Sequence, residues 1–277
     1  MAIEGNNIWA GTEVGLVKLD KATGTSTFYN TSNSGLPNNR IESIALDTSG
    51  VKWIGTTEGM AEFDGTNWTT YNSSNSGLPS NYVWSIAIDA SGTKWIGTNG
   101  GGMAKFDGTN WTIYNTSNSG LLHNVVLSIA IDASGTKWTG GGGLAEFDGT
   151  NWTTYDTSNS GLPHNVVLSI AIDARGTKWI GTNGGGMANF DGTNWTTYNT
   201  SNSGLPSDYV CSIAIDSSGS KWTGGDGLAE FDGTNWTTYN ISNSGLPDNV
   251  VLSIGIDASG TKWIGTISGM AKFEETK

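Results

Sequence analysis

The residues of this chain best suited to binding chemistry are a few aromatic and charged side chains that interrupt an otherwise repetitive sequence. Tyr82, Trp84 and Tyr209 could stack on a sugar or another flat ligand, because an aromatic ring offers a large apolar face with a polar tip. Arg40 occupies the position of Tyr82 one repeat earlier. The alternative interpretation is that these side chains pack between neighbouring repeats.

Two histidines, His123 and His164, occupy equivalent positions in consecutive repeats. An imidazole beside a carboxylate can act as a general acid or base, so His164 could pair with Glu42 or Asp248. The alternative is that both histidines lie on surface loops. Because no nucleophile, acid pair or metal-ligand set stands out from the repeat, we predict no enzyme activity, no catalytic residue, no metal and no cofactor. The predicted ligand-binding residues are Arg40, Tyr82, Trp84, His123, His164 and Tyr209.

A recurring aspartate could suggest a metal site, but one carboxylate per repeat is too dispersed for the six or more oxygen ligands of calcium. An Asp side chain readily accepts a hydrogen bond from the backbone N–H two residues on and so closes a turn. We therefore interpret both aspartate series as structural. The first series is Asp47, Asp89, Asp132, Asp173, Asp216 and Asp257, and the second is Asp64, Asp107, Asp148, Asp191 and Asp232.

The composition excludes several classes of protein. The chain has 277 residues, with 41 Gly, 13 Trp, only five Pro and a net charge of −12. Glycine without a Gly-X-Y period excludes collagen, and so many tryptophans argue against disorder. The acid surplus, without a basic patch, predicts no nucleic-acid partner. No apolar run of roughly 18 residues occurs, so we expect no membrane insertion. The single cysteine, Cys211, predicts no internal disulfide.

The chain is an internal repeat. One tryptophan, mostly preceded by Lys, recurs every 41 to 44 residues, and a second ends the motif Phe-Asp-Gly-Thr-Asn-Trp. Closer likeness at a spacing of 84 residues indicates duplication of a two-repeat unit. The first series is Trp9, Trp53, Trp95, Trp138, Trp179, Trp222 and Trp263, and the second is Trp68, Trp111, Trp152, Trp195 and Trp236. Only Trp84 belongs to neither series.

Each period contains four short runs typical of β-strands, separated by Gly-rich or Asp-containing turns. In one period these runs are 83–88, 94–98, 103–106 and 111–114, here called first to fourth strands. The polar segment 115–120 has no helical periodicity. Four strands per period of about 40 to 45 residues are typical of a WD40-like blade, so we predict an all-β propeller without helices.

The ends of the chain decide the number of blades. We favour seven, with a shortened first strand in the first blade and no fourth strand in the last. The alternative is six blades, in which the two terminal fragments share one. We expect a single domain, 1–277, whose open terminal edges could support oligomers. The approximate blades are 1–30, 31–72, 73–115, 116–156, 157–199, 200–240 and 241–277.

The motif that begins Gly77-Leu78-Pro79 and continues through Asp89 and Gly92 to Trp95-Ile96-Gly97-Thr98 resembles the two-component regulator propeller repeat. The resemblance implies a bacterial, extracytoplasmic or periplasmic sensor propeller that binds glycans or other ligands. The first 25 residues show no signal-peptide pattern. Further copies begin at Gly35, Gly120, Gly161, Gly204 and Gly245.

The connections from fourth to first strand and from second to third strand should emerge on one face, which carries most of the variation between copies. Our leading hypothesis is therefore a non-enzymatic, sensor-type module that binds a small molecule or glycan on this face around the central channel. The alternatives are a structural or engineered scaffold without a ligand and, less favoured, a propeller lyase or hydrolase.

Overall fold

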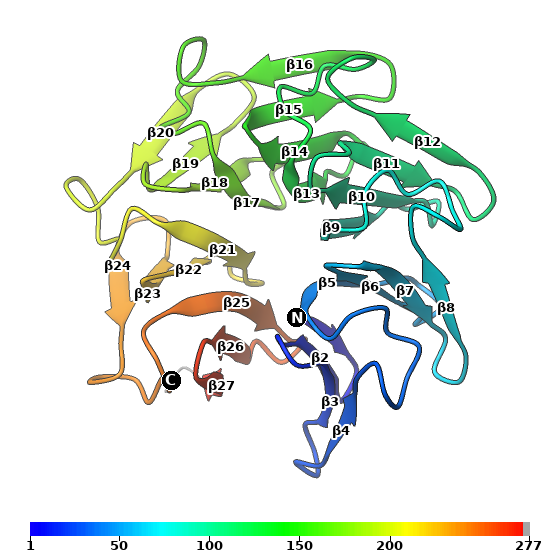
Figure 1. Ribbon diagram of the computed structural model, residues 1–277. Helices are drawn as coiled ribbons and strands as arrows, with labels where there is room; N and C mark the ends of the chain where they lie inside the picture. Colours follow the sequence, from blue (N-terminus) through cyan, green and yellow to red (C-terminus); the bar gives the residue numbers. More distant parts are fainter. Residues whose placement is uncertain (274–277) are drawn as a thin grey trace. The chain divides into compact units, whose positions relative to one another are not determined.

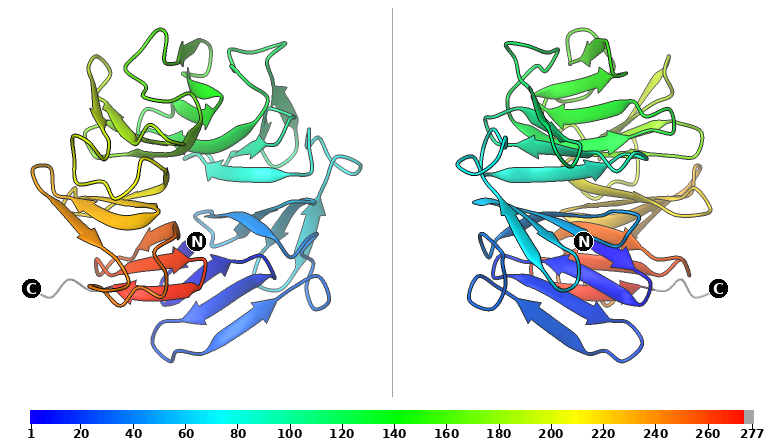
Figure 2. Two further views of the ribbon diagram at one scale, coloured as in Figure 1. Left: turned by 60° about the vertical axis from the view of Figure 1, so that its left-hand side comes forward. Right: turned by 90° about the vertical axis from the view of Figure 1, so that its right-hand side faces the viewer.

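The computed structural model describes residues 1–273, and all regular structure in them is β-strand. The strands form seven antiparallel sheets, in each of which chain neighbours are hydrogen-bonded neighbours (Figure 1). Figure 2 shows the same strands from two further sides, with the first sheet in blue. Residues 1–273 contain no helix, and so none that could cross a membrane.

The first four sheets each have four strands. Blade 1 comprises β1 (Ala2–Glu4), β2 (Asn7–Gly11), β3 (Leu16–Asp20) and β4 (Ser26–Tyr29). Blade 2 comprises β5 (Ile41–Leu46), β6 (Lys52–Thr56), β7 (Gly59–Phe63) and β8 (Trp68–Tyr71). Blade 3 comprises β9 (Val83–Ile88), β10 (Lys94–Thr98), β11 (Met103–Phe106) and β12 (Trp111–Tyr114). Blade 4 comprises β13 (Val126–Ile131), β14 (Lys137–Gly141), β15 (Gly143–Phe147) and β16 (Trp152–Tyr155).

The remaining sheets follow the same order. Blade 5 comprises β17 (Val167–Ile172), β18 (Lys178–Thr182), β19 (Met187–Phe190) and β20 (Trp195–Tyr198). Blade 6 comprises β21 (Val210–Ile215), β22 (Lys221–Gly225), β23 (Gly227–Phe231) and β24 (Trp236–Tyr239). Blade 7 has three strands in the described residues, β25 (Val251–Ile256), β26 (Lys262–Thr266) and β27 (Gly269–Phe273).

The sheet assignments settle the number of blades. β1 pairs with β2 in blade 1, whereas β25–β27 form a sheet of their own. The alternative of six blades, in which the terminal fragments share one sheet, is therefore wrong. The predicted fold class, a β-propeller with seven blades, is confirmed.

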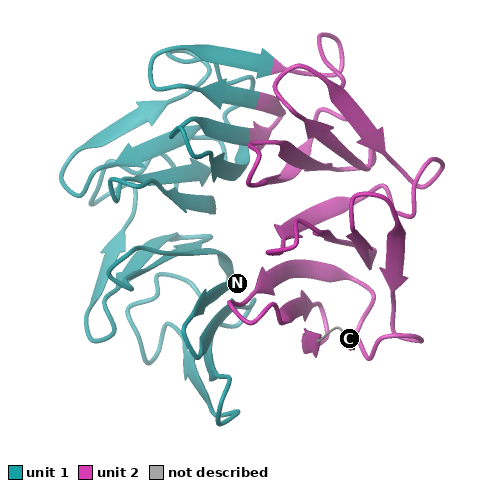
Figure 3. Cartoon of the chain, turned by 180° about the vertical axis from the view of Figure 1, so that it is seen from behind, with its two compact units in different colours: residues 1–139, 145–154 teal, residues 140–144, 155–277 magenta. Residues whose placement is uncertain are grey.

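The chain forms two compact units, coloured separately in Figure 3. Unit 1 comprises Met1–Thr139 and Ala145–Thr154, and it holds blades 1 to 3 with most of blade 4. Unit 2 comprises Gly140–Leu144 and Tyr155–Lys277, and it holds blades 5 to 7.

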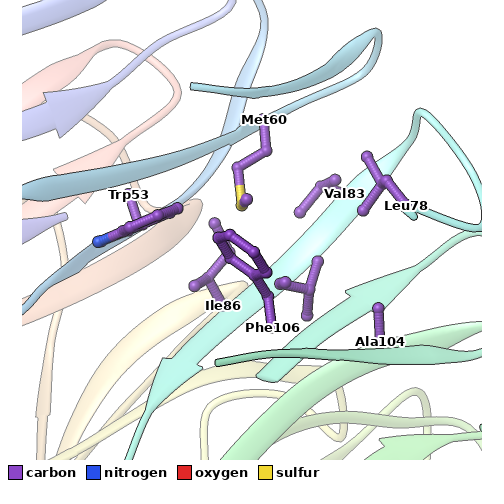
Figure 4. Close-up of a cluster of buried hydrophobic side chains, with 8 residues drawn as sticks. Trp53, Met60, Leu78, Val83, Ile86, Ala104 and Phe106 are labelled. Atoms are coloured by element: carbon purple, nitrogen blue, oxygen red, sulfur yellow. The ribbon is translucent and has the colours of Figure 1, made fainter. Parts of the chain in front are cut away.

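The apolar core of each unit lies between consecutive blades. Strands such as β6 are buried along their whole length, which explains why the second strands carry apolar or small residues on both faces. Figure 4 shows one core cluster, between blades 2 and 3, in which the edge of the Phe106 ring approaches Trp53 with centroids 6.1 Å apart. Its labelled members are Trp53, Met60, Leu78, Val83, Ile86, Ala104 and Phe106.

A hydrogen-bonded acid and tryptophan fasten each blade, and we call this pair the acid–Trp clasp. In blade 3, Asp89 Oδ1 accepts the N–H groups of Ser91 and Thr93, and Oδ2 accepts Trp95 Nε1–H at 2.9 Å. The structural interpretation of this aspartate series is therefore confirmed, although the bond to the indole was not foreseen. The other Asp–Trp clasps are Asp47–Trp53, Asp132–Trp138, Asp173–Trp179, Asp216–Trp222 and Asp257–Trp263.

Blade 1 has a glutamate in the clasp, because Glu4 Oε2 accepts Trp9 Nε1–H at 3.0 Å. Glu4 also accepts Lys52 Nζ at 2.8 Å from blade 2. This contact shows how the clasp of one blade can hold the next.

The lysine that precedes the clasp tryptophan links consecutive blades. Lys94 Nζ lies 4.3 Å from the centroid of the Trp53 ring in the preceding blade, a cation–π contact. In unit 2, Lys262 Nζ lies 4.7 Å from the Trp222 ring and 3.5 Å from Asp216 Oδ2. Lys262 is only 5% exposed, and a buried ammonium group needs such partners. The Lys-Trp pair thus serves two blades at once.

The clasp predicts a difference between the two aspartate series. Asp89→Ala should lower the free energy of unfolding by about 1 to 3 kcal/mol, because it leaves the buried Trp95 N–H without an acceptor. Asp107→Ala is the control, since Asp107 bonds only its own exposed turn. It should cost clearly less in urea denaturation monitored by tryptophan fluorescence. Equal losses for the two variants would contradict the assigned role.

The clasp also predicts acid sensitivity. Burial alone would raise the pKa of Asp89, but the donors Ser91, Trp95 and Thr93 stabilise the carboxylate, and the net pKa is lowered. A carboxyl whose pKa is lower in the folded state contributes stability above its unfolded pKa, and that stability is lost as pH falls through the folded value. The midpoint of thermal unfolding should therefore fall progressively below about pH 4. Asp89→Asn, which cannot ionise, should show a shallower fall, and a flat profile down to about pH 2.5 would contradict the prediction.

Candidate functional site

A β-bulge sets the side chains at the start of the first strands. In β9, Val83 lies opposite Thr98 and Ser85 opposite Gly97, which leaves Trp84 as the extra residue. The same shift occurs between Ile41 and Ser43 in β5, where Glu42 is the extra residue. Bulges re-aim a side chain and interrupt regular pairing. The bulge position also varies between repeats, as Glu42, Trp84 and Leu168 show.

Four residues from blades 2 and 3 of unit 1 meet at these bulges, and we call them the Glu42 cluster: Arg40, Glu42, Tyr82 and Trp84. Arg40 Nε donates to Glu42 Oε1 at 2.7 Å, and the Tyr82 hydroxyl donates to the same oxygen at 2.8 Å. The Tyr82 and Trp84 rings lie side by side, with centroids 4.3 Å apart and planes inclined by 34°. The structure thus brings together three of the six predicted site residues around one carboxylate.

The charges of the cluster are fixed by mutual contact. The Glu42 side chain is 14% exposed and the Arg40 side chain 50% exposed, with Arg40 Nη1 also 4.0 Å from Glu13 Oε1. Burial, together with the hydrogen bond to Glu42 and the charge of Glu42, raises the pKa of Tyr82 to about 12. The hydrogen bond and charge of Glu42 likewise raise the pKa of Arg40. At neutral pH, Tyr82 is therefore a neutral donor and Arg40 a cation.

One polar atom of the cluster lacks a partner. Trp84 Nε1 is buried and makes no hydrogen bond in residues 1–273. A buried N–H without an acceptor costs free energy, so such an atom calls for an explanation. A bound group with an oxygen acceptor would satisfy it once the side chains that cover this atom move aside. The cluster can therefore offer an aromatic pair, a partly exposed guanidinium group and one spare indole donor.

The predicted histidines close turns. His123 Nδ1 accepts the Val125 N–H and His164 Nδ1 accepts the Val166 N–H, both at 3.0 Å. Asp248 plays the same part in blade 7, where it accepts the Val250 N–H at 2.8 Å. His164 lies in unit 2 and Glu42 in unit 1. No hydrogen bond or ion pair found in the described residues joins either histidine to an acid.

Tyr209 belongs to a second group of polar side chains, in unit 2. Its backbone N–H donates to Ser207 Oγ, whose hydroxyl in turn donates to Asp226 Oδ2 at 3.0 Å. Cys211, the bulge residue of β21, directs its thiol to the Val251 carbonyl at 3.3 Å. Burial raises the pKa of both Tyr209 and Cys211, so the thiol is poorly reactive at neutral pH.

Glu42 is the site residue that sequence reasoning undervalued. The sequence indicates it only as a possible acid beside His164 and does not predict its bonds to Arg40 and Tyr82. The available signal was the pairing of positions two residues apart, Arg40 with Glu42 and Tyr82 with Trp84. Within residues 1–273, no three His, Cys, Asp or Glu side chains gather closely enough to hold a metal ion.

The repeats and sheets define the chain as a β-propeller. The family model described as "Two component regulator propeller" matches residues 77–100 and 161–184, which hold two of the motif copies. The resemblance of these two segments to the two-component regulator propeller repeat, stated from the sequence, is therefore confirmed. No curated protein matches the sequence.

Solved structures resemble the chain over nearly its whole length. One is the extracellular domain of a protein assigned as a hybrid two-component system of Bacteroides thetaiotaomicron, with 25% identity and a TM-score of 0.84. The match covers 98% of this chain but only 38% of that one. A streptogramin B lyase has 14% identity and a TM-score of 0.78, and the match covers 99% of this chain and 91% of that one. The WD40 propeller domain of Doa1 has 15% identity and a TM-score of 0.75, and the match covers 100% of this chain and 91% of that one. At these identities, the two structures share the fold alone.

The cluster predicts a specific titration. Glu42→Gln should lower the pKa of Tyr82 from about 12 towards its ordinary value near 10, because the negative charge beside the hydroxyl is lost. The pKa should stay above the ordinary value, since burial remains. Carbon-13 NMR of ring-labelled tyrosine, with Tyr82→Phe to assign the signal, measures this. Glu62→Gln is the matched control, because Glu62 accepts the hydroxyl of Tyr71 instead. An unchanged Tyr82 pKa in Glu42→Gln would contradict the assigned contact.

Proposed function

We propose that this chain is a non-catalytic, sensor-type binding propeller and that the Glu42 cluster binds a small polar ring ligand, a glycan or a related metabolite. The observation that carries the proposal is the Tyr82–Trp84 ring pair with its unpartnered indole N–H. The extracellular location named for the Bacteroides structure supports a role in sensing.

A sugar matches what the cluster offers. Its C–H face packs on aromatic rings, and its hydroxyl groups both accept and donate hydrogen bonds. Trp84 Nε1 would find its acceptor in a ligand oxygen, and the partly exposed Arg40 would donate to another. Sites with apolar walls and a few placed polar groups are typical of small-molecule binding.

The chemistry of the cluster supports binding rather than catalysis. The Glu42 carboxylate already accepts two hydrogen bonds, from Arg40 and Tyr82. A tyrosine with a pKa of about 12 is far from the value near the working pH that a general acid or base needs. Both histidines accept a backbone N–H through Nδ1. These observations favour a site that binds its ligand without converting it chemically.

The repeat supports a single site of this kind. At the bulge position of Trp84, blades 5 and 7 carry Leu168 and Leu252, and at the position of Tyr82, blade 5 carries Val166. Aliphatic side chains offer no flat face and no donor. We therefore expect one ligand per chain.

The residues found at these positions in blade 5 suggest variants that should test the site without disturbing the fold. Tyr82→Val with Trp84→Leu gives blade 3 the residues that blade 5 already has, so folding should be preserved. A glycan and metabolite screen by calorimetry should identify a ligand that binds with 1:1 stoichiometry, and the double variant should weaken it at least tenfold, about 1.4 kcal/mol. Tyr209→Val is the matched control and should leave affinity unchanged. A ligand indifferent to the double variant, or no ligand at all, would overturn the proposal.

A further inference from the structure

Two loops of this chain have the same sequence but different hydrogen bonds. Residues 92–104 and 176–188 are identical, Gly-Thr-Lys-Trp-Ile-Gly-Thr-Asn-Gly-Gly-Gly-Met-Ala. Each segment contains an Asn-Gly pair, Asn99-Gly100 or Asn183-Gly184, and no other Asn-Gly pair occurs in the sequence. The first pair lies in the loop between β10 and β11, and the second in the loop between β18 and β19 (Figure 1). A difference in reactivity between the two pairs would therefore come from the fold.

An Asn-Gly pair can modify itself. The backbone nitrogen of the glycine loses its proton to hydroxide and attacks Cγ, the side-chain carbonyl carbon of the asparagine. The new N–Cγ bond closes a five-membered succinimide ring, and the side-chain amide group takes up a proton from water and leaves as ammonia. Water then opens the ring at either carbonyl, which gives aspartate or its β-linked isomer, isoaspartate. Glycine favours the attack because it has no Cβ to obstruct the approach.

The two pairs are alike in accessibility and in the position of the asparagine. Both asparagines and the glycines that follow them are exposed. The Asn99 N–H donates to the Tyr82 carbonyl oxygen at 2.9 Å. In the same way, the Asn183 N–H donates to the Val166 carbonyl oxygen at 3.0 Å. No hydrogen bond found in residues 1–273 holds the carboxamide group of either asparagine. Each side chain is therefore free to meet the glycine nitrogen.

The N–H groups of the two glycines differ. The Gly184 N–H donates to the Asp208 carbonyl oxygen at 3.0 Å, whereas the Gly100 N–H makes no hydrogen bond in residues 1–273. The glycine two residues further on is bonded alike in both loops. The N–H groups of Gly102 and Gly186 each donate at 2.8 Å to a carbonyl oxygen in the segment that leads into the next blade. The loops thus differ at the nitrogen that attacks.

We propose that Asn99 is a spontaneous modification site, at which the folded chain converts asparagine to aspartate and isoaspartate, and that the Gly184–Asp208 hydrogen bond protects Asn183. A nitrogen that donates a hydrogen bond must lose that bond before it can give up its proton and turn towards Cγ. Gly100 has no such bond to break. One backbone hydrogen bond corresponds to a factor of about five in rate.

The Asn-Ser pairs of the loops from fourth to first strand are protected more strongly. In the loop between blades 2 and 3, Asn75 Oδ1 accepts the Asn72 N–H at 2.8 Å, and Asn75 Nδ2 donates to the Thr70 carbonyl oxygen at 3.1 Å. The carboxamide group is therefore fixed. The N–H that would attack it, that of Ser76, donates to the Asn72 carbonyl oxygen at 3.0 Å. Modification should accordingly occur at Asn99 before it occurs in this loop.

The modification lies beside the Glu42 cluster. The Asn99 N–H is bonded to the backbone of Tyr82, whose ring belongs to the cluster, and the Asn99 carbonyl oxygen accepts the Ser80 hydroxyl at 2.8 Å. Conversion adds a negative charge at residue 99, and the β-linked isomer also lengthens the backbone there by one carbon. The loop of blade 3 therefore changes with time, while the identical loop of blade 5 is preserved.

Mass spectrometry can compare the two sites within one molecule. The full chain is kept folded in mildly alkaline buffer, and samples are digested by a protease that is active in acid, where the reaction stops. We expect aspartate and isoaspartate to accumulate about five times faster at residue 99 than at residue 183. Both rates should rise with hydroxide concentration. Equal rates in the folded chain, faster conversion of Asn183, or no conversion of Asn99 would overturn the proposal.

The unfolded chain provides the matched control. In concentrated urea the two identical segments should convert at the same rate, so a difference that persists there would contradict a cause in the fold. Asn99→Gln should greatly slow conversion at residue 99, because glutamine must close a larger ring, and should leave the rate at Asn183 unchanged. Amide hydrogen exchange by NMR tests the cause separately, since the Gly100 N–H should exchange faster than the Gly184 N–H. Equal exchange of these two groups would contradict the assigned protection.

Discussion

The interaction on which the rest of this structure depends is the bond between a first-strand carboxylate and the indole N–H of the next strand. The carboxylate at once closes a turn, through the N–H groups of Ser91 and Thr93 in blade 3, and orients Trp95. The oriented ring then makes contacts both within its own blade and with the next blade. Tyr114 of its own blade stacks on it, and Phe147 and Lys137 of the next blade contact it. One hydrogen bond thus sets both the blade and its junction with the next.

Clasp residues and bulge residues differ in how freely they vary, and this difference explains where a binding site can form. Residues that make the clasp are nearly invariant between repeats because each serves two blades, whereas the bulge residues at the start of the first strands differ from blade to blade. Leucine occupies that position at Leu168 and Leu252, and Glu42 and Trp84 occupy it in blades 2 and 3. The Glu42 cluster therefore forms on the same bulged backbone that carries leucine in blades 5 and 7.

Much of the fold could be predicted from the sequence, because the same strand and turn patterns recur in every repeat and each copy supports the same assignment. The recurrence of Trp, Asp and Gly predicted the strands and the turns and favoured seven sheets over six. The alternation of residues along a strand does not reveal a bulge, so the direction of Trp84 could not be predicted. Nor could the bond from Tyr82 to Glu42, which lies 40 residues earlier, since non-local contacts follow from how consecutive blades pack.

Hydrogen exchange of the 13 tryptophan indole N–H groups tests whether clasped indoles hold the blades together. Nitrogen-15 NMR resolves these groups, and single substitutions assign them. We expect the clasped indoles, such as those of Trp95 and Trp222, to exchange far more slowly than the half-buried fourth-strand indoles, such as those of Trp68 and Trp111. Equal protection in the two groups, or faster exchange of the clasped indoles, would contradict the account.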